Sequence, residues 1–212
     1  FVADMSAIQD AMADLGGSVI DAWLGVVVLI FAVVTAVFAV ITFLRVRSEE
    51  NGGRAEPVLA TTVARSRWLG SHVVIALVGS ATLMTLTGLG LGLGAAATLG
   101  DGAMIGRILA AALAHVPAIW FTVGIAVALF GVLPRATLLV WLVIAYAGIV
   151  GWLGVLLQFP QWAMNLSPLG HTPLLPAEAM VLTPLVVLAA GATALTAGGL
   201  AGFRHRDLHT TA

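Results

Sequence analysis

The sequence predicts an all-α membrane protein whose chain crosses the bilayer about five times. Of its 212 residues, 60% are hydrophobic and 9% are charged, whereas a soluble domain carries about a quarter charged residues. Five charge-free apolar runs are long enough to span a bilayer, which takes about 20 residues of helix. No run alternates apolar and polar residues as a spanning β-strand does. Helices are therefore the structure that can satisfy the backbone hydrogen bonds in lipid.

The apolar runs place the elements in chain order within one transmembrane domain, 1–212. Residues 1–18 have apolar positions at helical spacing and acids on other faces, which predicts a short amphipathic helix on the outer surface. The spans are expected at about 19–44, 69–97, 105–131, 136–157 and 181–203. The fourth apolar run continues to residue 177, so about 20 residues remain after its span.

The arginines predict the orientation of the chain. If the first span runs from outside to inside, the loop 45–67, the turn at Arg135 and the C-terminal tail hold eight of the nine arginines. Only Arg107 then lies outside, where we expect it to pair with Asp101. Because an excess of basic residues marks cytoplasmic loops, we expect the N-terminus outside the plasma membrane and the C-terminus in the cytoplasm.

The loop after the first span concentrates the charge of the chain. Gly52-Gly53 ends the first helix, and Glu56-Pro57 then suits a first helical turn, where acids favour the helix dipole and proline loses no hydrogen bond. Val58, Leu59, Thr62 and Val63 follow at helical spacing. A short helix is therefore expected at about 54–66. The pattern alone allows either a docking surface or an interfacial helix that anchors the loop.

The sequence of this loop, EENGGRAEPVLATTVARSRW, resembles the signature of actinobacterial ABC-exporter permeases of the polyketide-antibiotic (tetronasin-type) family, within the ABC-2 membrane fold. Further motifs similar to that family follow in order: HVPAIW at 115–120, LFGVLPRAT at 129–137, SPLGHTPLLP at 167–176 and FRHRDL near the end. The resemblance covers nearly the whole chain. It implies a permease that exports hydrophobic or amphipathic compounds such as antibiotics or drugs.

The resemblance also implies which residues contact an ATP-binding subunit. In the family the matching loop forms a cytoplasmic coupling helix, with apolar residues such as Leu59 in a groove of the ATPase and charged residues such as Glu56 on its surface. Carried over residue by residue, the contact set is Glu49, Glu50, Gly53, Arg54, Glu56, Pro57, Leu59, Thr62, Val63 and Arg65.

The expected partners follow from the same resemblance. The chain has no lysine, which excludes a P-loop of its own, so ATP and Mg²⁺ are expected in a separate ABC ATP-binding subunit, expected as a dimer. We expect this chain to bind no cofactor, no metal and no nucleic acid, and to be a transport subunit in the lipid bilayer rather than an enzyme. Family members usually carry two six-span halves. This sequence is similar to the second half without its first span, so a second half is expected in the same chain or another copy.

Prolines and polar residues interrupt the second part of the fourth apolar run. Irregular backbone at membrane depth is tolerated only against protein or water. We therefore expect an extracellular element at about 159–178 that dips back towards the membrane. A plain outer loop with proline turns is the alternative. The element contains Ser167, Pro168, His171, Pro173 and Pro176.

Small and aromatic residues mark further candidate positions in the spans. Glycines four residues apart, Gly88 with Gly92 and Gly90 with Gly94, predict close helix packing, and Gly198 with Gly202 has the same spacing. Aromatic residues are available to contact an apolar substrate, although such residues equally face lipid or pack between helices: Trp120, Phe121, Phe130, Trp141, Tyr146 and Trp152.

Ionisable residues decide between competing functions. His115 lies within a predicted span, where such a group is a functional candidate, but a neutral histidine bonded to a neighbouring helix is the favoured interpretation. An ion-coupled secondary transporter usually needs acids inside its spans, and the five charge-free apolar runs contain none. An intramembrane enzyme is disfavoured, because no HExxH motif or nucleophile–base arrangement is recognisable. A non-transporting membrane partner of an ATPase stays open.

Overall fold

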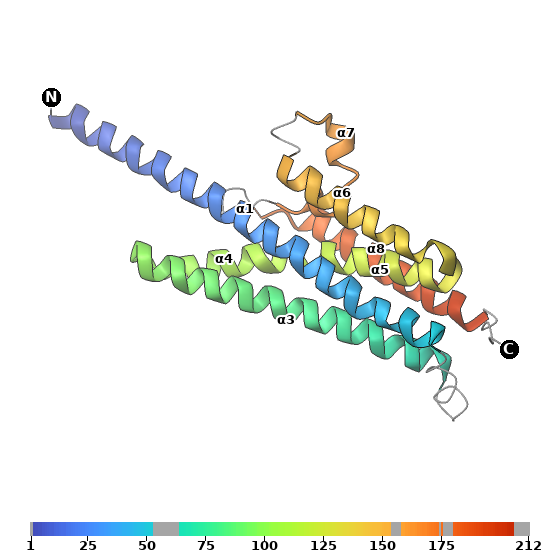
Figure 1. Cartoon of the computed structure of the whole chain (residues 1–212). Coiled ribbons are helices and arrows are strands. Elements are labelled where there is room, and N and C mark those ends of the chain that lie inside the picture. Colours follow the sequence, from blue (N-terminus) through green and yellow to red (C-terminus); the bar gives the residue numbers. More distant parts are fainter. Residues whose placement is uncertain (1, 53–63, 154–157, 174, 176–179, 206–212) are drawn as a thin grey trace.

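The computed structural model describes residues 2–52, 64–153, 158–173, 175 and 180–205, and these ranges contain helices and no strand. Five helical stretches are long and apolar enough to cross a membrane: Val19–Glu50, Arg65–Leu99, Ala103–Val132, Pro134–Gly151 and Leu182–His205. The predicted fold class, an all-α polytopic membrane protein with about five spans, is confirmed. The helices lie roughly along one direction, and the two termini lie at opposite ends of the molecule (Figure 1).

The first helix, α1 (Val2–Asn51), is continuous over 50 residues. The segment predicted as a short helix at 1–18 is therefore helical from Val2 onwards, but it is continuous with the first span. A glycine inside a helix costs only about 1 kcal/mol relative to alanine. Gly16 and Gly17 therefore do not end the helix before the long apolar segment that follows. In Figure 1 the N-terminal part of α1 extends beyond the other helices.

The third span consists of two helices, α4 (Ala103–Ala114) and α5 (Val116–Val132). His115 lies between them, and Pro117 occupies the first turn of α5. Proline has no N–H to donate to the carbonyl four residues earlier, and its ring clashes with that carbonyl. The hydropathy of the run predicts one span, and the proline explains why the helix is interrupted within it.

The described elements that follow the third span are two 3₁₀ helices and three α-helices. After α5 the chain forms the 3₁₀ helix η1 (Pro134–Leu139) and then α6 (Val140–Leu153). The hydroxyl of Thr137, fully buried, donates to the carbonyl oxygen of Pro134 at 2.9 Å and closes this turn. The short α7 (Gln161–Met164) and the 3₁₀ helix η2 (Pro168–His171) precede the last span, α8 (Leu182–His205).

Two pairs of helices pack through glycine. A Cβ atom added at Gly131 of α5 would overlap the backbone of Gly199 of α8, and one added at Gly199 would overlap the backbone of Val127. The second long helix, α3 (Arg65–Leu99), approaches α4 in the same way. Close backbone approach at small residues is how helices associate in a bilayer, where burying apolar area gives little gain.

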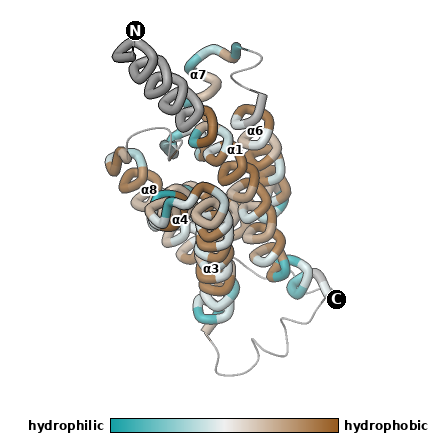
Figure 2. Tube along the Cα trace, turned by 90° about the vertical axis from the view of Figure 1, so that its left-hand side faces the viewer, coloured by the Kyte–Doolittle hydropathy of each residue, from teal (hydrophilic) through white to brown (hydrophobic). Residues whose placement is uncertain are grey.

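The outer surface of the bundle is apolar along the middle of the helices. Val34, Val78 and Leu86 are each more than half exposed, and Figure 2 shows hydrophobic residues along most of the helices. The end of the bundle where α1 and α8 finish and α3 begins is called the loop end below. Arg45, Arg67, Arg135 and Arg204 are exposed near this end.

Candidate functional site

The loop end holds the described part of the predicted ATPase contact. Glu49 and Glu50 lie in the last turn of α1, and Arg65 is the first residue of α3. The other predicted contact residues lie outside the described residues: Gly53, Arg54, Glu56, Pro57, Leu59, Thr62 and Val63. The structure thus brings the two ends of the charged loop together at neighbouring helices, α1 and α3.

Glu49 and His72 connect these two helices directly. A carboxylate oxygen of Glu49 lies 3.3 Å from Nε2 of His72. The other ring nitrogen, Nδ1, lies 3.1 Å from the carbonyl oxygen of Trp68. The ring of His72 therefore lies between a carboxylate of α1 and a carbonyl oxygen of its own helix, α3.

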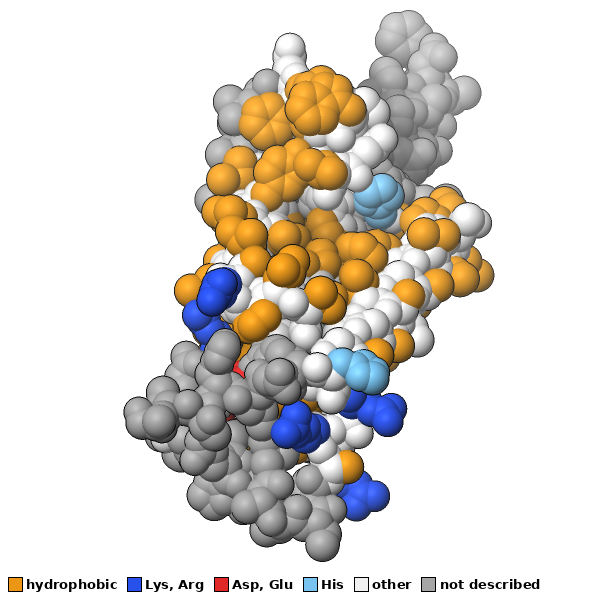
Figure 3. Space-filling model, turned by 90° about the vertical axis from the view of Figure 1, so that its right-hand side faces the viewer, with side chains coloured by type: hydrophobic (Ala, Val, Ile, Leu, Met, Phe, Trp, Pro, Cys, Tyr) orange, Lys and Arg blue, Asp and Glu red, His pale blue; other side chains and the backbone are white. Residues whose placement is uncertain are grey.

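Arginine side chains surround this end of the molecule. Figure 3 views the bundle from the side on which the loop end lies and shows arginines in the lower half of that face, below a largely hydrophobic area. Exposed positive charge attracts acidic protein surfaces and anionic lipid head groups. The loop end therefore differs in charge from the apolar flanks of the helices.

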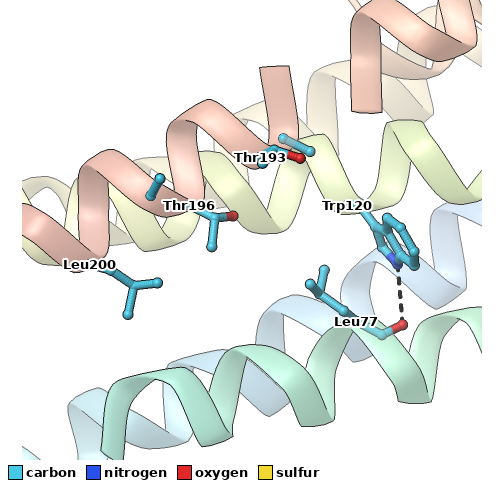
Figure 4. A pocket seen from close by; sticks show the side chains of 7 residues that line it. Leu77, Trp120, Thr193, Thr196 and Leu200 are labelled. Carbon is cyan, nitrogen blue, oxygen red and sulfur yellow. Dashed lines mark hydrogen bonds between the residues drawn. The ribbon is translucent and has the colours of Figure 1, made fainter. Parts of the chain in front are cut away.

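A pocket of about 290 Å³ lies between α3, α5 and α8 (Figure 4). Its lining residues are Leu77, Trp120, Ala192, Thr193, Thr196, Ala197 and Leu200. The indole N–H of Trp120 donates to the carbonyl oxygen of Leu77 at 3.2 Å, and the hydroxyl of Thr193 donates to Ala189 within α8 at 2.9 Å. Most of the lining side chains are apolar, so the pocket suits an apolar group. Trp120 is the one residue of the predicted aromatic set that lines it.

The predicted glycine pairs of α3 occupy different surroundings. A Cβ at Gly88 would lie 2.9 Å from Leu109 and Ala112, and one at Gly92 would lie 2.9 Å from Ile105, all on α4. Gly90 and Gly94 have no heavy atom of the described chain within 4 Å of such a Cβ. The repeated spacing therefore contains one pair that contacts a helix and one that faces outward.

The described part of the predicted outer element is folded against the bundle. Ser167, Pro168 and Pro173 are buried, whereas His171 is exposed. The ring Nδ1 of His171 lies 2.9 Å from the carbonyl oxygen of Ser167, and the hydroxyl of Tyr146 donates to Ala163 of α7 at 2.7 Å. Pro176 lies outside the described residues.

The predicted pairing of Arg107 with Asp101 is wrong. Arg107 of α4 donates to a carboxylate oxygen of Asp21 of α1 at 2.6 Å, while the carboxylate of Asp101 accepts the backbone N–H of Ala103 at 2.9 Å. Asp101 lies two residues before the start of α4, and its side chain accepts a hydrogen bond within its own turn. Arg107 lies further along α4, where α1 is its neighbour.

His115 is fully buried at the junction of α4 and α5. Its Nδ1 lies 2.9 Å from the carbonyl oxygen of Ala111 on its own helix, so the predicted bond to a neighbouring helix is not formed through this nitrogen. Among the described residues its Nε2 has no hydrogen-bond partner. The geometry assigns Nδ1 as the protonated nitrogen, because a carbonyl oxygen only accepts.

Comparison with known proteins places the chain in a family. Residues 1–204 match the family described as multidrug efflux system permease Rv1217c, C-terminal domain. The chain belongs to this family. It is also 36% identical over 210 residues to the multidrug efflux system permease protein Rv1217c of Mycobacterium tuberculosis (strain ATCC 25618 / H37Rv).

The match to Rv1217c covers 98% of this chain and 38% of the length of that relative. The family is that of a C-terminal domain, which agrees with the predicted resemblance to the second half of an exporter permease. The predicted recognition as an exporter permease is thereby confirmed.

Proposed function

We propose that this chain is the membrane-spanning C-terminal part of an ATP-driven exporter permease that moves hydrophobic or amphipathic compounds, such as drugs, out of the cell. The observation that carries the proposal is the family match over residues 1–204 to the C-terminal domain of a multidrug efflux permease. The apolar pocket between α3, α5 and α8 supports an apolar substrate.

In this proposal ATP hydrolysis takes place in a separate ATP-binding subunit, acting as a dimer, that holds ATP and Mg²⁺. The chain contains no lysine, so a P-loop lysine cannot come from it. The subunit docks on residues 49–66, where Glu49, Glu50 and Arg65 mark the two ends of the charged loop. A second half, in the same chain or in another copy, completes the permease.

The proposed orientation has the loop end in the cytoplasm and the described part of the 159–178 element outside. Eight of the nine arginines lie in segments assigned to the cytoplasmic side, as basic residues do in plasma-membrane proteins. Exposed Arg45, Arg67 and Arg204 at the loop end support this assignment. The ATPase and the basic segments then share one side of the membrane.

Co-purification tests the docking site. The full-length permease is expressed with candidate ATP-binding subunits, and the amount bound in detergent is compared for wild type, Glu56→Arg and Leu59→Asp. Glu178→Arg is the matched control, because it reverses a glutamate assigned to the opposite side. We expect both loop variants to lose the ATPase and the control to keep it. Equal binding in all four proteins would remove the docking assignment.

Transport in inside-out membrane vesicles tests the function itself. An ATP-driven exporter accumulates a hydrophobic dye inside such vesicles when ATP is added, and continues when the proton gradient is collapsed. Accumulation that disappears with the gradient would instead indicate an ion-coupled secondary transporter. ATPase binding without accumulation of any tested dye would indicate a non-transporting membrane partner.

A further inference from the structure

Aromatic side chains from four helices meet just inside the loop end. Phe43 comes from the last part of α1, Trp68 from the first turn of α3, Phe130 from the end of α5 and Phe203 from the end of α8. The three phenylalanines are fully buried and Trp68 is 7% exposed. These four residues are called the aromatic cluster. Successive members are 25 to 73 residues apart in the sequence, so only the fold brings them together.

The rings form an unbroken series of contacts. The ring centroids of Phe43 and Phe130 are 6.0 Å apart in an edge-to-face arrangement. Phe130 stacks on Phe203 at 5.5 Å, and Phe203 lies 6.0 Å from Trp68. These are separations at which aromatic pairs attract each other beyond the burial of their area. Displacing any one ring therefore disturbs contacts to at least one further helix.

The charged loop is connected to this series through His72. Its ring lies 5.3 Å from that of Trp68, and its Nε2 contacts Glu49, in the last turn of α1. Glu49 and Trp68 thus belong to the two helices that the loop joins. A change in the relative position of the two loop ends must alter the Glu49–His72 contact or move Trp68.

The same helices line the apolar pocket. Phe203 follows the lining residue Leu200 by three residues, Trp68 precedes Leu77 by nine, and Phe130 follows Trp120 by ten. At a rise of about 1.5 Å per residue, the cluster lies roughly 5 to 15 Å along the helices from the pocket. Packed cores respond to force by shifting between arrangements rather than by absorbing it, because they contain little empty space.

We propose that the aromatic cluster, with Glu49 and His72, is the positioning element that passes a displacement of the loop end to α3, α5 and α8 and so changes the pocket between them. This inference rests on the proposed function, since an ATP-binding subunit supplies the displacement. The cluster residues touch neither ATP nor the transported compound. They couple ATP hydrolysis to transport by joining the helix ends.

The test uses the full-length permease reconstituted with its ATP-binding subunit. Phe203→Leu and Trp68→Leu remove aromatic contacts of the cluster, and His72→Gln removes the ring contact with Trp68 and replaces the imidazole beside Glu49 by an uncharged amide. The matched controls are Phe31→Leu and Trp23→Leu, whose side chains are exposed on α1 and outside the cluster. For each protein we measure bound ATPase, ATP hydrolysis, transported dye and the midpoint of thermal unfolding.

We expect the cluster variants to bind the ATPase as wild type does and to transport at least about fivefold less dye per ATP hydrolysed, the lower end of usual coupling between sites. The controls should keep the wild-type ratio. A merely structural cluster would lower the unfolding midpoint and leave the ratio unchanged, which would overturn the inference. If the two leucine variants are not produced as folded protein, His72→Gln still tests the inference. His72 lies at the edge of the cluster, so its replacement leaves the buried rings in place.

Failure of the proposed function has a different signature. If wild-type permease binds no ATPase and transports nothing on addition of ATP, the proposed function is overturned and the inference with it. If wild type transports and the cluster variants match the controls, the inference alone is overturned.

Discussion

Asp21 of α1 and Arg107 of α4 form an ion pair between these helices, which illustrates how position along a helix determines a partner. Asp21 is the more buried of the two, with its side chain 15% exposed. Its second oxygen, Oδ1, is buried without a hydrogen-bond partner among the described residues. Arg107 supplies a charged donor to the other oxygen, which offsets part of the cost of placing this carboxylate between helices.

Loss of this pair should destabilise the protein. We expect Arg107→Gln to lower the free energy of unfolding by about 1–3 kcal/mol, because a mostly buried carboxylate then loses its charged donor. The midpoint of thermal unfolding in detergent measures this. Arg135→Gln, at an exposed arginine of η1, should leave the midpoint close to wild type. Partial recovery in the double variant Asp21→Asn with Arg107→Gln is also expected, and its absence would show that Arg107 acts through other contacts.

A second residue-scale prediction concerns the pocket. Ala197→Trp introduces an indole into the lined space, whereas Ala194→Trp places the same side chain at an exposed position of α8 that does not line it. We expect Ala197→Trp alone to raise the dye concentration for half-maximal efflux by at least about tenfold, which corresponds to about 1.4 kcal/mol. An unchanged concentration dependence would mean that the transported compound does not use this pocket.

At the scale of helices, the α5–α8 contact depends on glycine at specific positions. Gly199→Ala should lower the unfolding free energy by about 1–3 kcal/mol, because its Cβ would overlap the backbone of α5 and the helices would have to separate. Gly198→Ala, next to it, meets no atom of the described chain within 4 Å and should be neutral or slightly stabilising. Equal midpoints for the two variants would contradict the helix register.

The positions of helices were largely predictable from the sequence, whereas their contacts were not. Long apolar runs require spanning helices because no other structure satisfies the backbone in lipid. Hydropathy is nevertheless the same for a straight and an interrupted span, so the break at His115 was missed although Pro117 was a visible signal. Similarly, spacing alone could not distinguish Gly92, which contacts α4, from Gly94, which faces outward.

In the candidate site, too, the sequence predicted the elements but not the contacts between them. The charged loop was recognisable from composition and motif, and Glu49, Glu50 and Arg65 lie at its described ends. The contact between Glu49 and His72 and the meeting of Phe43 with Phe130 depend on which helices become neighbours. Such pairings require the three-dimensional fold, because no local pattern joins residues so far apart in the chain.

At the scale of the whole molecule, the orientation in the membrane is testable with thiol labelling. The sequence contains no cysteine, so Ala64→Cys at the loop end and Leu166→Cys in the outer element each introduce one thiol at an exposed position. In intact cells, a membrane-impermeant maleimide should label Leu166→Cys and not Ala64→Cys. Inside-out vesicles should give the reverse, and the unmodified protein supplies the background. The opposite pattern would invert the proposed orientation.

The interruption at His115 divides one span between two neighbours. Its first portion, α4, is held against α3 at Gly88 and Gly92, and its second portion, α5, is held against α8 at Gly131 and Gly199. The bundle thus contains two closely packed helix pairs, α3 with α4 and α5 with α8, and the interrupted span α4–α5 connects them. A rotation of one pair relative to the other at His115 would change the width of the pocket between α3, α5 and α8 and would keep the glycine contacts within each pair.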